Sequence, residues 1–169
     1  MDIMTEIRER RSIRHFNTKP VDRGTLERIL EAGRLAPSAK NRQECRFVVI
    51  TDAGLKERLC AAAYGQNFIS DAPVVIAACT TNIEYKMPNG QLSYPIDLAF
   101  AVSFMMIQAE SEECGTCCVT TFDEQIVREV LTVPFSMRVV MLLVIGNYDL
   151  KPDAVPRKSL KKIISYNHW

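Results

Sequence analysis

Val139-Val140-Met141-Leu142-Leu143-Val144-Ile145, followed by Gly146, is the strongest strand signal in the sequence. Its length is that of an ordinary strand, and its β-branched residues are enriched in strands. Polar residues do not alternate with the apolar ones, which is typical of a strand covered on both faces. The sequence therefore predicts a central strand at residues 139–145.

Three further segments predict strands that join this one. Residues 73–79 also lack polar alternation, while residues 47–50 and 116–121 are shorter and rich in β-branched or small residues. Between them, the sequence predicts a helix over residues 96–110 that is apolar on nearly every face, as in a central helix. In a domain this small, such burial points to a second subunit.

The remaining helices are predicted from their starts and stops. Asp22, Asp52 and Asp123 are candidate N-caps, and Pro37 ends the helix that Asp22 begins. A short amphipathic helix is predicted at residues 2–11, and an exposed loop at residues 85–94. Strands and helices alternate along one domain, residues 1–169, which indicates a three-layer α/β/α arrangement and leaves the strand directions open.

The charge of the chain is balanced in total but not along its length. The 169 residues include 21 Lys and Arg against 20 Asp and Glu, for a net charge of +1. Residues 1–46 carry 11 basic and 7 acidic side chains, residues 47–150 carry 5 and 12, and residues 151–169 carry 5 and 1. The total argues against a general nucleic-acid or membrane-surface binder, which needs a broad basic field.

The N-terminus, the longest apolar stretch and the cysteines together predict a cytoplasmic protein. The first six residues lack the basic and apolar regions of a signal peptide. The longest apolar stretch, residues 96–109, is too short and too polar to cross a bilayer. Six cysteines without a secretion signal indicate reduced thiols rather than a disulfide framework.

The first candidate site is Arg10-Arg11-Ser12-Ile13-Arg14. Three guanidinium groups and a hydroxyl in five residues suit a phosphate monoester, because arginine offers bidentate N–H donors. A solvated helix end with the same charges is the alternative. Arg157 and Lys158 in the tail join this site only if the tail meets the first helix.

The second candidate site is the loop Ala36-Pro37-Ser38-Ala39-Lys40-Asn41-Arg42-Gln43. Small residues allow a ligand to approach the backbone, and two carboxamides suit the donor and acceptor edge of a heterocycle. A polar loop that faces water is the alternative.

Cys114-Gly115-Thr116-Cys117-Cys118 has a spacing that suggests metal or redox chemistry. Structural zinc needs four ligands, and the sequence holds only two histidines and no second cysteine pair. Small buried hydrophobic residues are therefore the favoured interpretation of these cysteines. The glycines form neither a dinucleotide-binding nor a P-loop pattern.

Five motifs, in order along the chain, resemble those of the nitroreductase family of FMN-dependent oxidoreductases. Residues 7–16 are similar to the family's R-R-S-x-R-x-F start, and residues 29–43 resemble its second helix and A-P-S-x-x-N-x-Q loop. Residues 71–76 resemble its D/E-A-P-V-V-I strand, and residues 115–124 its G-T-C-W-I-G-A-F-D-E segment. Residues 156–169 resemble the end of its short members, so the motifs cover nearly the whole chain.

The resemblance implies an α+β fold, a three-layer α/β/α sandwich with a mixed, mainly antiparallel central sheet, in an obligate homodimer with FMN at the subunit interface. By position, the residues implied to hold the FMN phosphate and ribityl chain are Arg10, Arg11, Ser12, Arg14, Arg157 and Lys158. Those implied to meet the ribityl chain and isoalloxazine edge, from the other subunit, are Pro37, Ser38, Ala39, Asn41 and Gln43. Cys114, Gly115 and Thr116 are implied to bring backbone amides toward the flavin N5.

The activity implied is hydride transfer from NADH or NADPH through FMN to a flat small-molecule acceptor, such as a nitroaromatic or a quinone. The chemistry then belongs to the flavin, and no catalytic side chain and no metal is expected. One alternative is a flavin-binding or flavin-handling protein of the same fold without reductase turnover. A second is a cysteine-based metal-binding module.

The chain also departs from the family pattern. Glu113-Cys114-Gly115 stands in place of G-L-G, and Gln43-Glu44-Cys45 in place of Q-P-W, which removes a large aromatic side chain. Cys118 stands in place of a tryptophan. Residues 80–95 form a short connection, which implies a reduced substrate lid.

Overall fold

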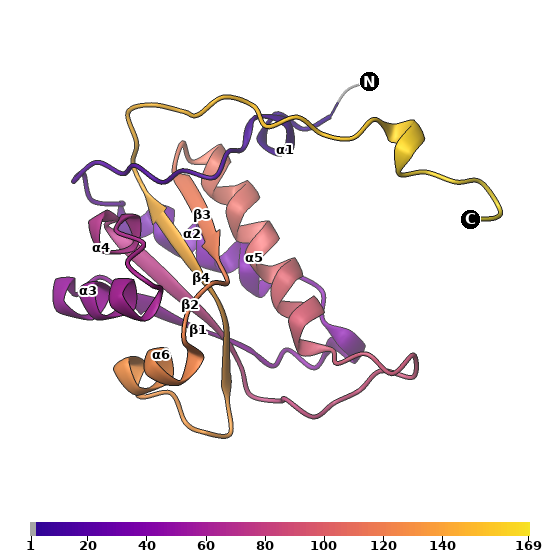
Figure 1. Cartoon of the computed structure of the whole chain (residues 1–169), viewed down its shortest axis with the longest axis horizontal. Helices are drawn as coiled ribbons and strands as arrows, with labels where there is room; N and C mark the ends of the chain where they lie inside the picture. The colour runs from indigo at the N-terminus through magenta and orange to yellow at the C-terminus, as the bar shows by residue number, and fades with distance from the viewer. Residues whose placement is uncertain (1–2) are drawn as a thin grey trace.

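The computed structural model describes residues 3–169 and contains one four-stranded sheet (Figure 1). The strands are β1 (Cys45–Ile50), β2 (Val74–Thr80), β3 (Gly115–Val119) and β4 (Arg138–Gly146), and their order in the sheet is β1-β2-β4-β3. All three strand pairs are antiparallel. Among the described residues, parallel pairing is confined to one bridge between Ser12 and Thr116. The mainly antiparallel character of the sheet is thereby confirmed.

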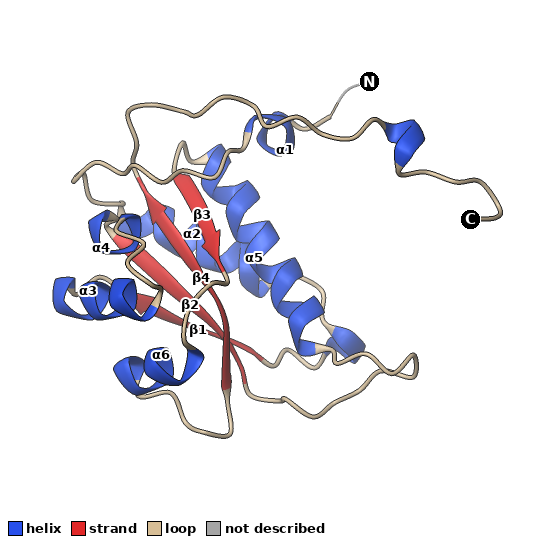
Figure 2. Ribbon diagram, in the orientation of Figure 1, coloured by secondary structure: helices blue, strands red, loops and turns tan. Residues whose placement is uncertain are grey.

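Helices cover both faces of the sheet, so the fold has three layers (Figure 2). On one face lie α3 (Ala53–Ala62), α4 (Phe68–Asp71) and α6 (Glu124–Leu131); on the other lie α2 (Arg23–Arg34) and α5 (Tyr94–Ser111). Successive residues of β2 point to opposite cores: Val75 and Ala77 to the first, Ile76 and Ala78 to the second. Every residue of β2 is buried, as the missing polar alternation predicts.

The three aspartates expected to cap helices do so. The side chains of Asp22, Asp52 and Asp123 accept hydrogen bonds from backbone N–H groups in the first turns of α2, α3 and α6, at 3.1, 2.8 and 3.1 Å. Each carboxylate satisfies a donor that has no partner inside the helix, which fixes where the helix begins.

One predicted helix needs correction, and another helix was not predicted. The helix predicted at residues 2–11 is shorter, because α1 spans Thr5–Glu9 and Arg10 already has an extended ψ of 134°; residue 2 lies outside the described residues. The short helix α4 has no counterpart in the predicted elements. The long helix α5 is not buried on every face in this single chain, since Phe100 and Phe104 are 46% and 41% exposed.

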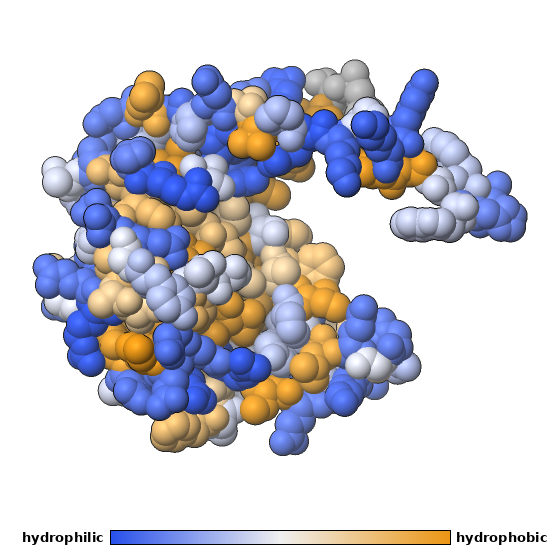
Figure 3. Space-filling view, viewed as in Figure 1, coloured by the Kyte–Doolittle hydropathy of each residue, from blue (hydrophilic) through white to orange (hydrophobic). Residues whose placement is uncertain are grey.

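The C-terminal tail leaves the body of the protein. Apart from Lys151, every side chain from residue 151 to 169 is exposed, including those of the short turn η2 (Leu160–Lys162). Figure 1 shows the tail running past α1 and out beyond the body. In Figure 3, the surface is hollowed beneath the tail, and apolar side chains gather there over α5. No helix within residues 3–169 is long and apolar enough to span a membrane.

Candidate functional site

The N-terminal arginines and the tail form the walls of one pocket of about 660 Å³. Nearly all of its charged lining is basic, and Asp153 is the acidic member. The residues that line it are Ile7, Arg8, Arg10, Arg11, Ser12, Arg14, Pro152, Asp153, Ala154, Val155 and Arg157. The structure therefore brings Arg157 to the N-terminal cluster, whereas Lys158 is exposed and lies outside the lining. We call this the arginine pocket.

Two anchors hold the walls of the arginine pocket together. Beside β3, the backbone N–H of Ile13 donates to the carbonyl of Thr116 at 2.9 Å, and the Ile13 side chain is buried. At the start of the tail, Lys151 pairs with Glu110 at the C-terminal end of α5. Residues about 140 positions apart thus meet because one segment follows the sheet edge and the other is tied to α5.

The charges in the arginine pocket are only partly compensated. Arg8 and Arg11 lie 3.0 and 4.0 Å from Glu9, but within residues 3–169 no carboxylate lies within ion-pair distance of Arg10, Arg14 or Arg157. The Nε of Arg11 is buried without a hydrogen-bond partner. An unpartnered buried donor is costly, and clustered like charges repel, so an anion in this pocket would relieve both.

Cys114, Gly115 and Thr116 lie beneath the arginine pocket rather than in its wall. All three are buried, and the structure does not bring them into the lining of either large pocket. A Cβ added to Gly115 would lie 2.6 Å from the Ile13 side chain and 2.7 Å from that of Tyr148. Glycine at this position therefore lets the segment that carries the arginines pack against β3.

The second candidate loop is held in a strained conformation. Lys40, Asn41 and Gln43 have φ angles of 53°, 54° and 55°, in the left-handed region that non-glycine residues avoid. Asp97, only 5% exposed, accepts a hydrogen bond from the N–H of Ala39 at 2.9 Å. The Ser38 hydroxyl accepts one from the N–H of Gln43 at 3.0 Å. Such over-determined strain is a common property of functional loops.

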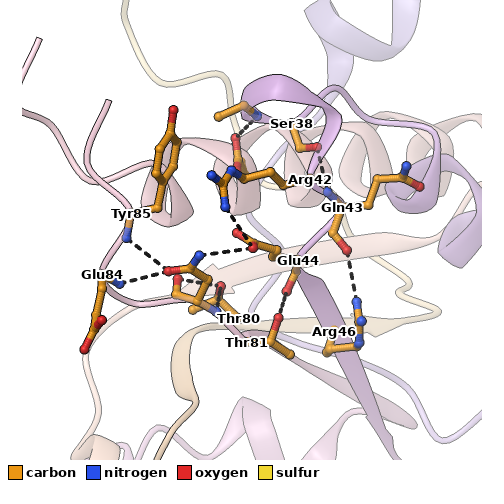
Figure 4. A network of polar contacts seen from close by, with 12 residues as sticks. Ser38, Arg42, Gln43, Glu44, Arg46, Thr80, Thr81, Glu84 and Tyr85 are labelled. Atoms are coloured by element: carbon orange, nitrogen blue, oxygen red, sulfur yellow. Dashed lines mark hydrogen bonds and ion pairs between the residues drawn. The ribbon is translucent and has the colours of Figure 1, made fainter. Parts of the chain in front are cut away.

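A polar network ties this loop to the connection after β2 (Figure 4). The side chain of Glu44 accepts a hydrogen bond from Asn82 at 3.1 Å and lies 3.6 Å from Arg42. The side-chain oxygen Oδ1 of Asn82 in turn accepts hydrogen bonds from the backbone N–H groups of Glu84 and Tyr85. The Arg42 guanidinium stacks over the Tyr85 ring at 3.9 Å from its centroid, a favourable cation–π contact. The short connection therefore folds onto residues 42–44.

A second pocket, of about 430 Å³, lies between the C-terminal end of α2, strand β1 and the N-terminal half of α5. We call it the Cys45 pocket. Of the predicted loop residues, it brings together Pro37, Ser38 and Gln43, whereas Ala39 and Asn41 lie outside its lining. Its apolar lining comes from Leu30, Gly33, Ala36, Phe47, Val49 and Ala101, and its other members are Arg34, Cys45, Arg46 and Asp97.

The two sets of predicted cofactor residues lie at opposite ends of α5. The loop is bonded to Asp97 in the first turn of this helix, and the arginine pocket is anchored at Glu110 near its last turn. Thirteen residues of α-helix measure about 20 Å. Within a single chain, a cofactor that contacts both sets of residues has to span a distance of this order.

The cysteines are arranged as core residues. Cys117 packs into the core on the α3 side of the sheet, whereas Cys114 and Cys118 pack into the core on the α5 side. Burial raises the pKa of all three thiols, so they are protonated at neutral pH. Within residues 3–169, no three His, Cys, Asp or Glu side chains come together in a way that could hold a metal ion.

Sequence reasoning did not single out several side chains that shape these sites. Asp97 fixes the strained loop, Tyr85 receives Arg42, and Arg46 lines the Cys45 pocket. Only Asp97 carried a signal, as a carboxylate inside an almost uninterrupted apolar helix. The other two depend on contacts between loops that are far apart in sequence.

Comparison with known proteins matches these observations. The family model described as the nitroreductase family matches residues 7–71 and 60–147. An NADH dehydrogenase of Thermus thermophilus is 46% identical over 76 residues, which are 45% of this chain and 37% of the relative. An FMN reductase (NAD(P)H) of Bacillus subtilis is 32% identical over 78 residues, 46% of this chain and 31% of the relative. The matched segments thus span about a third of these two relatives.

Structural similarity extends over the full length of the chain. The crystal structure of a nitroreductase family protein from Clostridium difficile 630 has a TM-score of 0.88 and 28% sequence identity, and the match covers 100% of both chains. Together with a family model that matches residues 7–147, this full-length likeness shows that the chain belongs to the nitroreductase family.

Proposed function

We propose that this chain is an FMN-dependent NAD(P)H oxidoreductase that works as a homodimer and reduces a flat small molecule such as a nitroaromatic or a quinone. The observation that carries the proposal is the arginine pocket. It presents three arginines without a carboxylate partner in the described chain, and the buried Nε of Arg11 without any hydrogen-bond partner. These donors suit the phosphate of FMN.

The names of two relatives support the same cofactor and donor. The Bacillus subtilis relative is an FMN reductase that uses NAD(P)H, and the Thermus thermophilus relative is an NADH dehydrogenase. When bound, FMN supplies two-electron transfer between a nicotinamide and an acceptor. Arg10, Arg11, Ser12, Arg14 and Arg157 then bind its phosphate, with Lys158 contributing charge from solvent. Gly115 and Thr116 support the segment that carries these residues.

The homodimer is supported by the position of the strained loop. The loop that holds Pro37, Ser38, Ala39, Asn41 and Gln43 is anchored at Asp97, about 20 Å along α5 from Glu110, where the tail of the arginine pocket is anchored. This separation favours a second copy of the chain as the source of the loop that meets the flavin. Apolar side chains of α1, α5 and the tail are exposed in the single chain, namely Ile7, Phe100, Phe104, Leu160, Ile163 and Ile164. Exposed apolar side chains on α5 and on a tail that leaves the body are suited to burial against a second copy of the chain.

The experiment is flavin binding by the double variant Arg14→Ala/Arg157→Ala. The purified wild-type protein is expected to be yellow, to release FMN, and to bind FMN more tightly than riboflavin because of the phosphate. Two charge-assisted hydrogen bonds are lost in the variant, so the preference for FMN should fall about 100-fold or more, with unchanged circular dichroism. Arg23→Ala/Arg58→Ala, which alters two exposed arginines outside the pocket, is the matched control.

Two results would contradict the proposal. An unchanged preference for FMN in the double variant would show that the phosphate lies elsewhere. A yellow protein that oxidises neither NADH nor NADPH with a quinone or a nitroaromatic would instead favour a flavin-binding or flavin-handling protein of the same fold. Stoichiometric zinc without flavin absorbance would favour a cysteine-based metal module.

A further inference from the structure

The strained loop at residues 38–43 needs contacts from outside to keep its conformation. Three of its non-glycine residues have left-handed φ angles between 53° and 55°. A side chain with a Cβ avoids this region, and such a conformation persists only where the surroundings hold it. At the start of the loop, the carboxylate of Asp97 supplies such a contact, because it accepts a hydrogen bond from the N–H of Ala39 at 2.9 Å.

Glu44 supplies a second anchor at the end of the loop. Its backbone carbonyl accepts hydrogen bonds from the N–H and the hydroxyl of Thr81, at 3.1 and 3.3 Å. Its carboxylate accepts one from the side-chain amide of Asn82 at 3.1 Å (Figure 4). The Glu44 side chain is only 22% exposed, and a hydrogen bond to a carboxylate that is shielded from water is stronger than one between neutral groups. The end of the loop is thereby tied to the connection after β2.

Asn82 connects this second anchor to α5. Its Oδ1 accepts hydrogen bonds from the N–H groups of Glu84 and Tyr85, both at 3.0 Å, which fixes a turn in the connection. The Tyr85 carbonyl accepts one from the N–H of Ser93, the N-cap residue of α5, at 3.2 Å. Both ends of the strained loop are therefore held to the start of α5, one directly by Asp97 and the other through Asn82.

The same turn places the Tyr85 ring against the cations of the loop. The Arg42 guanidinium lies 3.9 Å and the Lys40 ammonium 5.5 Å from the ring centroid, and both contacts are favourable. Lys40 is itself one of the residues in the left-handed region. Because Asn82 fixes the turn that carries Tyr85, one asparagine supports the strained part of the loop as well as its end.

We propose that the hydrogen bond between Glu44 and Asn82 is a latch that keeps residues 39–43 in the conformation that meets the flavin. Glu44 and Asn82 are then positioning residues, which raise the affinity for the flavin ring through the loop. A loop that already has its binding conformation binds more tightly, because it loses less freedom when the ligand binds. The proposal rests on the proposed function, in which this loop meets the ribityl chain and the isoalloxazine edge.

The test reverses the hydrogen bond of the latch. Asn82→Asp sets two carboxylates against each other but keeps the Oδ1 acceptor of the turn, so the Kd values for FMN and for riboflavin should both rise about tenfold. In Glu44→Gln/Asn82→Asp an amide again donates to a carboxylate, and both Kd values should return to within about threefold of the wild type. Glu44→Gln alone keeps an acceptor for Asn82 and should have a similarly small effect. Flavin fluorescence measures binding to the full-length protein.

The matched control is Asn89→Asp. It makes the same change in the same connection, on an exposed side chain whose hydrogen bonds are to Gln91, and it should alter neither Kd. The ratio of the two Kd values separates the latch from the phosphate site. Because the latch acts at the ring end of the flavin, Asn82→Asp should keep the wild-type preference for FMN over riboflavin, which Arg14→Ala/Arg157→Ala reduces.

Hydrogen exchange of the full-length protein without added flavin tests the latch independently of the cofactor. Asn82→Asp should speed exchange at residues 39–43 and 81–85 and leave the amides of α3 unchanged. Unchanged exchange in the two segments would overturn the latch. Faster exchange without a change in flavin affinity would overturn it too, and so would a double variant that binds flavin as weakly as Asn82→Asp. A wild-type protein that binds neither flavin would contradict the proposed function instead, and the exchange rates would still decide whether the latch exists.

Discussion

Glu113 lies between α5 and β3 in a backbone conformation that favours glycine. Its φ is 58°, and its N–H donates to the carbonyl of Glu110 at the end of the helix. The family pattern has glycine here, and the left-handed turn explains why, because a Cβ in this region costs about 1–2 kcal/mol. The side chain is exposed and does not line either pocket. Glutamate in place of glycine at this position therefore affects the stability of the fold rather than the lining of a pocket.

Glu113→Gly is therefore expected to stabilise the protein. Relief of the left-handed strain exceeds the entropy that glycine adds to the unfolded chain, for a net gain of about 0.5–1 kcal/mol in the free energy of unfolding. Urea denaturation followed by circular dichroism measures it. Glu113→Ala keeps the Cβ and removes the charge, so it should not stabilise. Equal gains for the two variants would show that charge repulsion, not backbone strain, is relieved.

The acidic residues beside Glu113 hold separate elements together. Glu110 pairs with Lys151 of the tail, and Glu112 accepts two hydrogen bonds from Arg28 of α2, at 2.6 and 2.7 Å. Two of the acidic residues in the middle of the sequence, Glu110 and Glu112, therefore form ion pairs at the C-terminal end of α5. These ion pairs hold α2 and the start of the tail against α5. Because the tail forms one wall of the arginine pocket, they also help to position that pocket.

The Arg28–Glu112 pair predicts a pH-dependent stability for the contact between α2 and α5. The hydrogen bonds from Arg28 lower the pKa of Glu112 from 4.5 to about 2, against the opposing effect of its burial. A carboxyl group with a lowered pKa stabilises the folded state above its unfolded pKa and loses this effect as the pH falls. The difference in urea midpoint between wild type and Arg28→Met should therefore be full above about pH 5 and vanish near pH 2.

The control for this prediction is Arg23→Met on the same helix. Arg23 pairs with Glu27, but both side chains are largely exposed, at 90% and 61%, so the pair contributes little. The urea midpoint of Arg23→Met should therefore equal that of the wild type at every pH. A difference for Arg28→Met that stayed constant down to pH 2 would show that lost packing, rather than the ion pair, is responsible.

The single chain exposes large apolar side chains to solvent on α5 and along the tail. Phe100 and Phe104 stand on the outer face of α5, and the tail carries exposed aliphatic and aromatic residues past the body (Figure 3). In the proposed homodimer, this surface is covered and the strained loop of one subunit faces the arginine pocket of the other. Dimer formation and flavin binding should therefore be lost together.

Phe100→Asp/Phe104→Asp tests this link. Burying two carboxylates in an apolar interface is unfavourable, so light scattering should give a mass near 19.1 kDa for the variant and twice that for the wild type. FMN should be lost while the helix content is retained. Phe135→Asp is the matched control, since Phe135 is 81% exposed in the loop before β4 and its variant should remain a yellow dimer. A dimeric variant without flavin would contradict the coupling.

Short-range patterns of the sequence predict much of this architecture. The apolar run at residues 139–145, the capping aspartates and the motif order predict the sheet core, the helix starts and the family. These features are local, because strand burial and helix capping depend on residues a few positions apart. The same local patterns point to the candidate site residues.

Only the tertiary structure decided which of these residues are neighbours. It joins Arg157 to Arg10 and Arg14, separates them from the Ser38 loop by the length of α5, and places Gly115 under Ile13 instead of in a pocket wall. It also assigns Asp97 and Arg46 to the sites. The physical reason is that such contacts are set by how the sheet edge and α5 fix distant segments in space, and neither periodicity nor charge along the chain encodes those distances.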